Sequence, residues 1–270
     1  MVGTGPAAAE THVLRQDLFL GQSGFVTGAG SGIGRAVALR LVGLGMNVFG
    51  VGRRLEMLEE TERLSKGGTG NFEFVSCNVR DSLAIEAAVQ AFGRRRGIDL
   101  LVNNAGGQFF AQAIDITRKG WDAVIDLNLN AVFTITKAAY PFLKERRGSV
   151  ANLSLSGVDR GSMGLAHSIA ARAGVLGLTR SLALEWARDG IRLNCIGPGT
   201  VVTEGLAGEA ARTILDRLTA ATPMGITTSP EEIAELIAFL ASPAARLMTG
   251  QLIQIDGAAH LGEGLHLIAP

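Results

Sequence analysis

The sequence has few of the residues that build disulfide frameworks or metal centres. It contains two cysteines in 270 residues, Cys77 and Cys195, and each lies inside a strand-like run. Two isolated cysteines supply neither a set of disulfides nor the paired spacing of a metal site. We therefore expect no bound metal, and the scarcity of cysteine favours a reducing compartment, the cytoplasm.

Long hydrophobic runs are also missing. No apolar stretch approaches the roughly 20 residues of a membrane-spanning helix, and the first 20 residues lack the apolar core of a secretory signal. The last residues, "HLIAP", do not form a peroxisomal signal of the Ser-Lys-Leu type. These absences predict no membrane partner.

An excess of charge of one sign is absent as well. The chain has 25 Lys and Arg against 25 Asp and Glu, so its formal net charge is zero. A surface that coats nucleic-acid phosphates needs a basic excess. The short basic run Arg94-Arg95-Arg96 is expected at the end of a helix, where cations suit the helix dipole. We expect no nucleic-acid partner.

The sequence does contain short apolar runs, and these alternate with longer segments whose apolar residues recur at the spacing of an α-helix. Strands are expected at 23–28, 46–51, 72–77, 98–104, 148–154, 191–197 and 251–256, and helices at 32–45, 81–96, 121–145, 168–189 and 230–241. Such alternation predicts an α/β fold with a parallel sheet covered by helices on both faces. No linker or internal repeat divides the chain, so the prediction is a single doubly wound domain of about seven parallel strands.

Two segments fall outside this alternation. Residues 1–20 are expected to form an N-terminal extension, with the domain spanning 21–270. Residues 204–225 are too long for a plain connection between a strand and a helix. Insertions of this kind commonly cover binding clefts, so we expect a lid there.

A glycine-rich loop, "TGAGSGIG" at 27–34, follows the first expected strand and opens the first expected helix. Gly28, Gly32 and Gly34 have the spacing G-x-x-x-G-x-G. Glycines at these positions permit a tight turn and let backbone N–H groups approach a pyrophosphate at a helix N-terminus. The loop predicts a dinucleotide cofactor.

The end of the second expected strand bears on which dinucleotide is bound. A site for NAD usually has an acidic residue there to accept hydrogen bonds from the ribose hydroxyls. Here the strand is followed by Arg53 and Arg54, and the first acid is Glu56. Guanidinium groups can pair with a 2′-phosphate. NADPH is therefore favoured over NAD, although two solvated arginines at a helix start remain the alternative.

With these residues in view, the chain resembles the short-chain dehydrogenase/reductase family over nearly its whole length. The glycine loop matches, as do "NNAG" at 103–106 and "GPGTVVT" at 197–203. The resemblance implies a Rossmann fold, a nicotinamide cofactor and a homotetramer. It further implies that Asn128 is the helix asparagine that holds a proton-relay water, and that Asn78 replaces an adenine-contacting aspartate. The cofactor contacts implied in this way are Gly28, Ser31, Gly32, Ile33, Gly34, Arg53, Arg54, Asn78, Val79, Asn104, Ala105, Gly106, Arg172, Pro198, Gly199, Val201 and Thr203.

The chain departs from the family at the active-site motif. The family places a serine on the fifth strand and Tyr-x-x-x-Lys on the next helix. Here the two helix positions are Ser168 and Arg172, and Ser154 and Ser156 bracket the expected strand serine. The only tyrosine, Tyr140, comes before the fifth strand and is expected to pack at a helix end.

A narrower branch shares this departure. "NNAGGQF" and "AHSIAARAGVLGLTRSLALEWA" resemble trans-2-enoyl-CoA reductases of the peroxisomal type and the related 2,4-dienoyl-CoA reductases. This resemblance implies reduction of the 2,3 double bond of an acyl-CoA thioester.

The chemistry of the two replaced residues agrees with that activity. Ketone reduction needs an acid that protonates an alkoxide, but a serine is a poor acid and Arg172 effectively never releases its proton. Enoyl reduction needs only hydrogen-bond donors at the thioester oxygen, which Ser168 could supply. His167 could act as a general acid or simply pack, and Asp159 could orient a water or simply be solvated. The alternatives are a short-chain alcohol or 3-oxoacyl oxidoreductase, and a dinucleotide-binding protein without catalysis.

Overall fold

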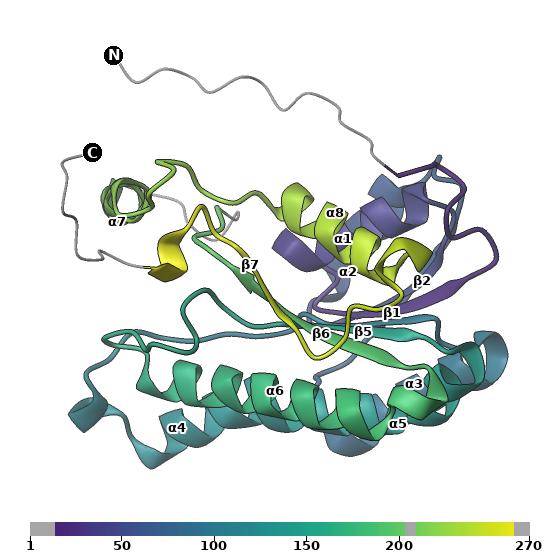
Figure 1. Cartoon of the computed structure of the whole chain (residues 1–270), viewed down its shortest axis with the longest axis horizontal. Helices are drawn as coiled ribbons and strands as arrows, with labels where there is room; N and C mark the ends of the chain where they lie inside the picture. The colour runs from purple at the N-terminus through teal and green to yellow at the C-terminus, as the bar shows by residue number, and fades with distance from the viewer. Residues whose placement is uncertain (1–13, 203–208, 262–270) are drawn as a thin grey trace.

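The centre of the molecule is a seven-stranded parallel sheet (Figure 1). The computed structural model describes residues 14–202 and 209–261. The strands are β1 (Ser23–Thr27), β2 (Asn47–Gly52), β3 (Phe72–Ser76), β4 (Leu100–Asn103), β5 (Ser149–Leu153), β6 (Arg192–Pro198) and β7 (Leu252–Ile255). Their order is β3-β2-β1-β4-β5-β6-β7. The doubly wound fold is confirmed, and every expected strand overlaps an observed one.

Helices cover both faces of the sheet. They are α1 (Gly32–Gly43), α2 (Leu55–Ser65), α3 (Ser82–Arg96), α4 (Arg118–Ile125), α5 (Ala131–Arg146), α6 (Ala166–Glu185), α7 (Glu209–Ala220) and α8 (Pro230–Ala241). In Figure 1, α1, α2 and α8 lie above the sheet and α3, α4, α5 and α6 lie below it. None of the described helices is both long enough and apolar enough to cross a membrane.

The core consists of two apolar layers, one on each face of the sheet. Adjacent strand residues point to opposite faces, so Phe25 packs with the α3 and α5 side while Val26 packs with α1 and α8. Ile135 of α5 and Ile237 of α8 close the two layers from outside. Burying each such side chain contributes roughly 1.5–3 kcal/mol. The continuous apolar runs of the central strands therefore follow from burial on both faces.

Local sequence signals set several helix ends. Helix α8 begins with a capping box, in which Ser229 accepts from the Glu232 N–H and the Glu232 carboxylate accepts from the Ser229 N–H. Helix α3 begins at the cap residue Asp81 and is followed by Gly97 at φ +75°. Glycine favours that left-handed conformation because it has no Cβ.

Two expected helices differ from the observed ones by more than two residues at an end. The segment expected as one helix over 121–145 begins earlier, at Arg118, because Thr117 caps it by accepting from the Gly120 N–H at 3.1 Å. It is then interrupted by a π-helical turn at Asp126–Asn130 before α5 begins. Helix α6 begins at Ala166 and ends at Glu185, short of the expected 189, and a 3₁₀ turn covers the remainder.

The structure describes parts of the expected N-terminal extension (1–20) and of the expected lid (204–225). Residues 1–13 lie outside the described residues, but Phe19 is fully buried and its N–H donates to the Leu44 carbonyl at 2.9 Å. The end of the expected extension is therefore packed against the domain. In the expected lid, α7 occupies Glu209–Ala220, and residues 203–208 lie outside the described residues. That α7 covers the cleft stays a prediction.

Candidate active site

A cavity of about 740 Å³ opens at the carboxyl ends of β1 and β4. The sheet order reverses between these two strands, and crevices at such switch points are where doubly wound folds bind ligands. Most of the predicted cofactor residues line the cavity. They are Gly28, Ser31, Gly32, Ile33, Arg53, Arg54, Asn78, Val79, Asn104, Ala105, Gly106, Arg172, Pro198 and Gly199.

The glycine loop is built for close approach of a ligand to the backbone. A Cβ on Gly34 would lie 2.1 Å from the Gly28 carbonyl oxygen, so only glycine fits there, and Gly28 itself has φ +69°. The Asn104 side chain braces the loop by donating to the Thr27 carbonyl at 2.9 Å, while the Thr27 hydroxyl accepts from the Asn104 and Ala105 N–H groups. The second motif therefore holds the glycine loop against β4.

The cavity wall carries three cationic side chains and no acidic one. Arg53, Arg54 and Arg172 all line it, and no Asp or Glu is among the described residues that do so. The Arg54 guanidinium donates to the Ser31 hydroxyl at 3.2 Å, and neither Arg53 nor Arg54 has an ion-pair partner among the described residues. This wall suits a ligand with several negative charges.

Arg172 lies beside the central part of the cavity. Its Nη1 donates to the carbonyl oxygens of Leu153 and Ser154 at 3.1 and 3.0 Å, and its buried Nε has no partner among the described residues. A Cβ on Gly106 would lie 3.0 Å from Nη2. Burial lowers the pKa of Arg172 to about 10. A cation buried without a carboxylate is costly, and a ligand oxygen at Nε would offset that cost.

Ser154 is the second residue with an unpaired polar atom at the cavity. It directly follows β5, it is 4% exposed, and its buried Oγ has no partner among the described residues. The neighbouring Leu155 also lines the cavity, whereas the Ser156 hydroxyl donates to Asp256. Of Ser154 and Ser156, which bracket the predicted strand serine, only Ser154 lines the cavity.

Ser168 and His167 lie behind the cavity wall. Both are fully buried at the start of α6, and neither is among the residues that line the cavity. The Ser168 hydroxyl donates to the side-chain oxygen of Gln108 at 2.5 Å. The His167 ring meets Phe109 edge to face at 4.3 Å between centroids, its Nδ1 accepts from the Ser168 N–H, and its Nε2 has no partner in the described part of the chain. The catalytic roles of these two residues stay predictions.

Asn128 lies in the π-helical turn, a feature that often marks functional sites. Its Nδ2 donates to the carbonyl oxygens of Gly107 and Val124, both at 2.8 Å, and its Oδ1 accepts from the Gly107 N–H at 3.2 Å. Both amide hydrogens are thus used within the protein. Asn128 holds the loop after β4, and it is buried and does not line the cavity, so its predicted role in holding a water stays a prediction.

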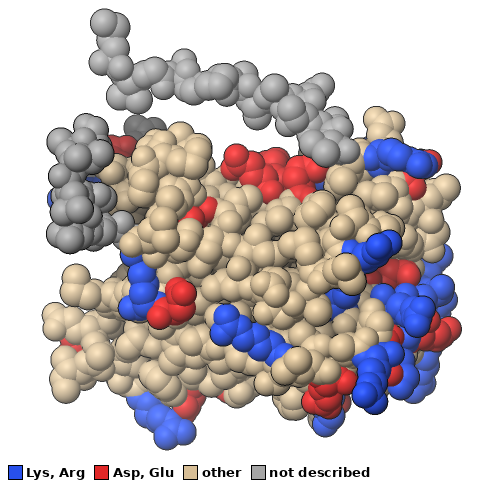
Figure 2. Space-filling view, viewed as in Figure 1, with Lys and Arg blue, Asp and Glu red and all other residues tan. Residues whose placement is uncertain are grey.

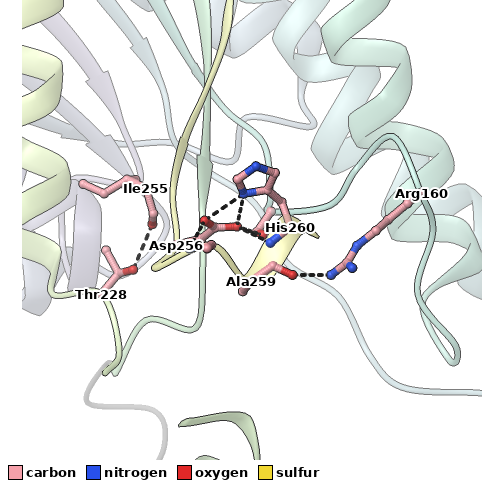
Figure 3. A network of polar contacts seen from close by, with 8 residues as sticks. Arg160, Thr228, Ile255, Asp256, Ala259 and His260 are labelled. Carbon is pink, nitrogen blue, oxygen red and sulfur yellow. Dashed lines mark hydrogen bonds and ion pairs between the residues drawn. The ribbon is translucent and has the colours of Figure 1, made fainter. Parts of the chain in front are cut away.

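A polar network joins the loop after β5 to the segment after β7 (Figure 3). The Asp256 carboxylate accepts from the Ser156 hydroxyl and from the His260 N–H at 2.7 Å, and it pairs with the His260 ring at 3.0 Å. Arg160 donates to the Ala259 carbonyl at 2.5 Å. Burial raises the pKa of Asp256, but the hydrogen bonds from Ser156 and His260 outweigh it and hold the pKa below its usual range. Asp159, by contrast, is exposed.

Comparison with known proteins identifies the family. Residues 28–260 match the family model described as enoyl-(acyl carrier protein) reductase. The chain belongs to the short-chain dehydrogenase/reductase family. It is therefore an NAD(P)-dependent oxidoreductase, and the cavity with its glycine loop, unpaired Arg172 Nε and close approach at Gly106 fits such a cofactor.

Several relatives show the range of this similarity. The chain is 39% identical over 241 residues to a probable 2,4-dienoyl-CoA reductase of Bacillus subtilis, covering 86% of this chain and 94% of the relative. It is 38% identical over 240 residues to the 3-oxoacyl-[acyl-carrier-protein] reductase FabG of Thermotoga maritima, covering 86% and 95%. Among solved structures it resembles a citronellol catabolism dehydrogenase of Pseudomonas aeruginosa, with 35% identity, a TM-score of 0.81 and coverage of 92% and 98%. The branch suggested by the sequence is among these relatives.

Three of the predicted cofactor contacts are not among the residues that line the cavity, and Gln108, which lines it, was not predicted as a site residue. Gly34 shapes the glycine loop without lining the cavity, Val201 instead pairs with Thr228 in an isolated β-bridge, and Thr203 lies outside the described residues. Gln108 lines the cavity although the sequence analysis assigned it no role. Its position directly after the "NNAGG" loop is the signal that could have pointed to it. In the described part of the chain, no group of three or more His, Cys, Asp or Glu side chains could hold a metal ion.

Proposed function

We propose that the protein reduces the 2,3 double bond of trans-2-enoyl-CoA thioesters with NADPH, as a cytoplasmic homotetramer in fatty acyl metabolism. The observation that carries the proposal is the absence of a proton-donating tyrosine at the cleft. Ser168 and Arg172 stand where the family has tyrosine and lysine, and the only tyrosine hydroxyl, that of Tyr140, donates to Asp189 at 2.8 Å. An activity that needs no acid at the substrate oxygen suits these residues best.

The chemistry balances without such an acid. A reduced nicotinamide held by the residues of the cavity would supply the hydride that the β-carbon of the enoyl group accepts, together with its two electrons. The electron pair of the double bond moves toward the thioester oxygen, which becomes an enolate that hydrogen-bond donors stabilise. The α-carbon then takes a proton from water, and the Oδ1 of Asn128 retains a lone pair that could hold this water. Arg172 holds the ribose hydroxyls and so sets the geometry of hydride transfer.

The NADPH preference rests on Arg53 and Arg54. Both side chains reach the cavity, and among the described residues no carboxylate lines it to accept from a free ribose 2′-hydroxyl. A 2′-phosphate would give the two guanidinium groups a charge partner.

A second candidate is reduction of 3-oxoacyl thioesters, favoured by the 38% identity to FabG of Thermotoga maritima. That reaction needs a proton at the substrate oxygen, which would have to come from water or from the buried His167. The two candidates share the thioester but differ in the carbon that is reduced.

The deciding experiment measures NADPH oxidation with trans-2-enoyl-CoA and 3-oxoacyl-CoA substrates of matched chain lengths. We expect turnover of the enoyl series, with one solvent deuterium on the α-carbon of the product in heavy water. Replacing Arg53 and Arg54 together with alanine should weaken NADPH binding by roughly 10- to 100-fold, the effect of losing charge-assisted hydrogen bonds. NADH binding should be unchanged. Turnover of the 3-oxoacyl series alone would contradict the proposal.

A further inference from the structure

A second hollow lies between the starts of α4 and α6, two helices that pack together below the sheet (Figure 1). It has a volume of about 510 Å³ and is lined by Ala113, Ile116, Arg118, Trp121 and Ala166. Its walls therefore come from the loop after β4, from α4 and from the residue that opens α6. We call this hollow the side groove.

One loop links the side groove with the cleft. Gln108, on the loop after β4, lines the cleft, and Ala113 on the same loop lines the groove. Between them, the Phe109 ring meets the His167 ring of α6 edge to face, with 4.3 Å between centroids. The same ring lies against α4, where a Cβ on Gly120 would be 2.9 Å from the Phe109 Cζ. A ligand that extends from the cleft along this loop reaches the groove next.

The loop that forms the groove is held at both ends. The Ala111 N–H donates to the Gly164 carbonyl, on the loop before α6, at 3.1 Å. At the other end, the Thr117 hydroxyl accepts from the Gly120 N–H at 3.1 Å and caps α4. The groove is thus formed before a ligand arrives, and binding there does not have to order the loop.

The charges at the groove favour an uncharged ligand. Among the described residues that line it, Arg118 is the only charged one. The Arg118 Nε donates to both carboxylate oxygens of Asp122 at 2.8 Å, so its charge already has a partner. The cations that suit phosphate groups, Arg53 and Arg54, line the cleft instead. The phosphates of a carrier such as CoA therefore gain little in the side groove.

Apolar side chains continue the groove outward. Phe110 and Ile114, on the same loop, are 76% and 89% exposed, and Trp121 is 37% exposed. Exposed apolar groups gathered at a groove are typical of binding sites. A hydrocarbon chain would cover them without needing a hydrogen-bond partner. Each methylene group that it buries is worth about fourfold in affinity.

We infer that the side groove binds the distal part of the acyl chain, which makes the protein selective for medium- and long-chain thioesters over short-chain ones. The inference rests on the proposed enoyl thioester reduction and names its substrate class. The enoyl end of the chain lies in the cleft, and the alkyl end passes Phe109 into the groove. No bond forms or breaks in the groove, so chain length acts through binding.

Trp121 provides a readout that does not depend on activity. The chain has two tryptophans, and the other, Trp186, is only 8% exposed and packs against Tyr140. With NADP⁺ present, decanoyl-CoA should shift the tryptophan emission to shorter wavelength, because the alkyl chain removes water from Trp121. Butanoyl-CoA and CoA alone should leave the emission unchanged. Trp121→Phe should abolish the shift, and the matched control Trp186→Phe should retain it.

A kinetic test fills the groove by Ala113→Phe, at an exposed position where the fold tolerates a larger side chain. We expect the ratio of kcat/KM for trans-2-decenoyl-CoA to that for crotonyl-CoA to fall by roughly 15- to 60-fold, the loss of two or three buried methylene groups. The matched control is Ala87→Phe, at an exposed alanine of α3 that does not line the groove. Its ratio should equal that of the unmodified protein.

The outcomes distinguish this inference from the proposed function. Reduction of decenoyl-CoA with no emission shift, or with an unchanged ratio in Ala113→Phe, would overturn the inference and leave the proposed function standing. A Trp121 shift with decanoyl-CoA but no reduction of any enoyl-CoA would overturn the proposed function and support the inference. An equal shift with CoA alone would show that the groove holds the carrier, and would overturn the inference.

Discussion

At the scale of single residues, two buried polar atoms at the cleft have no hydrogen-bond partner within residues 14–202 and 209–261. They are the Nε of Arg172 and the Oγ of Ser154, in residues linked by the hydrogen bond from Arg172 to the Ser154 carbonyl. Buried polar groups are nearly always paired in folded proteins. Unpaired atoms on the wall of one cavity therefore mark where ligand oxygens are expected. A Cβ on Gly106 would crowd the Nη2 of Arg172 on the same wall.

The first residue-scale prediction concerns Arg172. Burial lowers its pKa to about 10, below the unfolded value, so the charged guanidinium destabilises the folded protein by a constant amount below about pH 10. This destabilising contribution shrinks as pH rises from about 10 toward the unfolded value. Arg172→Met removes the cost. We expect the variant without ligand to melt at the same temperature or a few degrees higher, and to lose most of the stabilisation that saturating NADP⁺ gives the unmodified protein.

Thermal melts with and without NADP⁺ measure both effects. Arg172→Lys serves as the control because it keeps a cation near the ribose, and it should retain more of the ligand-induced stabilisation. A full gain in melting temperature with NADP⁺ in Arg172→Met would show that this residue does not hold the cofactor.

At the scale of elements, the segment after β7 fastens the loop after β5. Asp256 receives hydrogen bonds from Ser156 on that loop and from His260 on its own segment, and Arg160 donates back to Ala259 (Figure 3). The loop follows Ser154 and Leu155 directly, so the same contacts hold one wall of the cleft. A loop with few regular backbone bonds needs such side-chain contacts to keep a single conformation.

We predict that Asp256→Asn destabilises the protein by roughly 1–3 kcal/mol near pH 7, the cost of disrupting buried hydrogen bonds to a charged group. The folded-state pKa of Asp256 lies below its unfolded value of about 3.9. Its contribution is therefore present above about pH 4 and is lost as pH falls through the folded-state value. Urea unfolding at a series of pH values should show the two proteins converging in acid.

The matched control for this prediction is Asp159→Asn. Asp159 is an exposed carboxylate on the same loop, so its replacement should leave the free energy of unfolding unchanged at every pH. The free energies of unfolding of Asp256→Asn and of the unmodified protein could instead differ by the same amount from neutral pH down to acid. That result would mean that the charge of Asp256 contributes nothing to stability.

At the scale of the whole molecule, the surface suits association with copies of the chain better than binding to a polyanion. Basic and acidic side chains are intermixed on the face shown in Figure 2. Large apolar side chains are exposed on two helices below the sheet, Phe133 on α5 at 48% and Leu184 on α6 at 83%. Exposed apolar groups on neighbouring elements are typical of subunit interfaces.

We predict a tetramer, with a native mass about four times the 28.2 kDa of the chain. Leu184→Glu should reduce the assembly to smaller species, because a carboxylate is costly to bury between subunits. Leu83→Glu is the control, since Leu83 is similarly exposed, at 80%, but lies on α3. Analytical ultracentrifugation separates the species, and a monomer in the unmodified protein would contradict the prediction.

The sequence by itself determined the strands, the glycine loop, the cationic end of β2 and the missing tyrosine, because periodicity, turn chemistry and motif spacing are local properties of the chain. It could not show the break at Asp126–Asn130, since a single π-helical turn is too short to interrupt the apolar pattern of a long helix. Nor could it show that Ser168 faces Gln108, that Asn128 holds Gly107, or that Ser156 donates to Asp256. These pairs are 60, 21 and 100 residues apart. The packing of α6 and the π-helical turn against the sheet, and the pairing of β7 with β6 inside it, bring these residues into hydrogen-bond distance. That arrangement decides which polar groups remain free to meet a substrate.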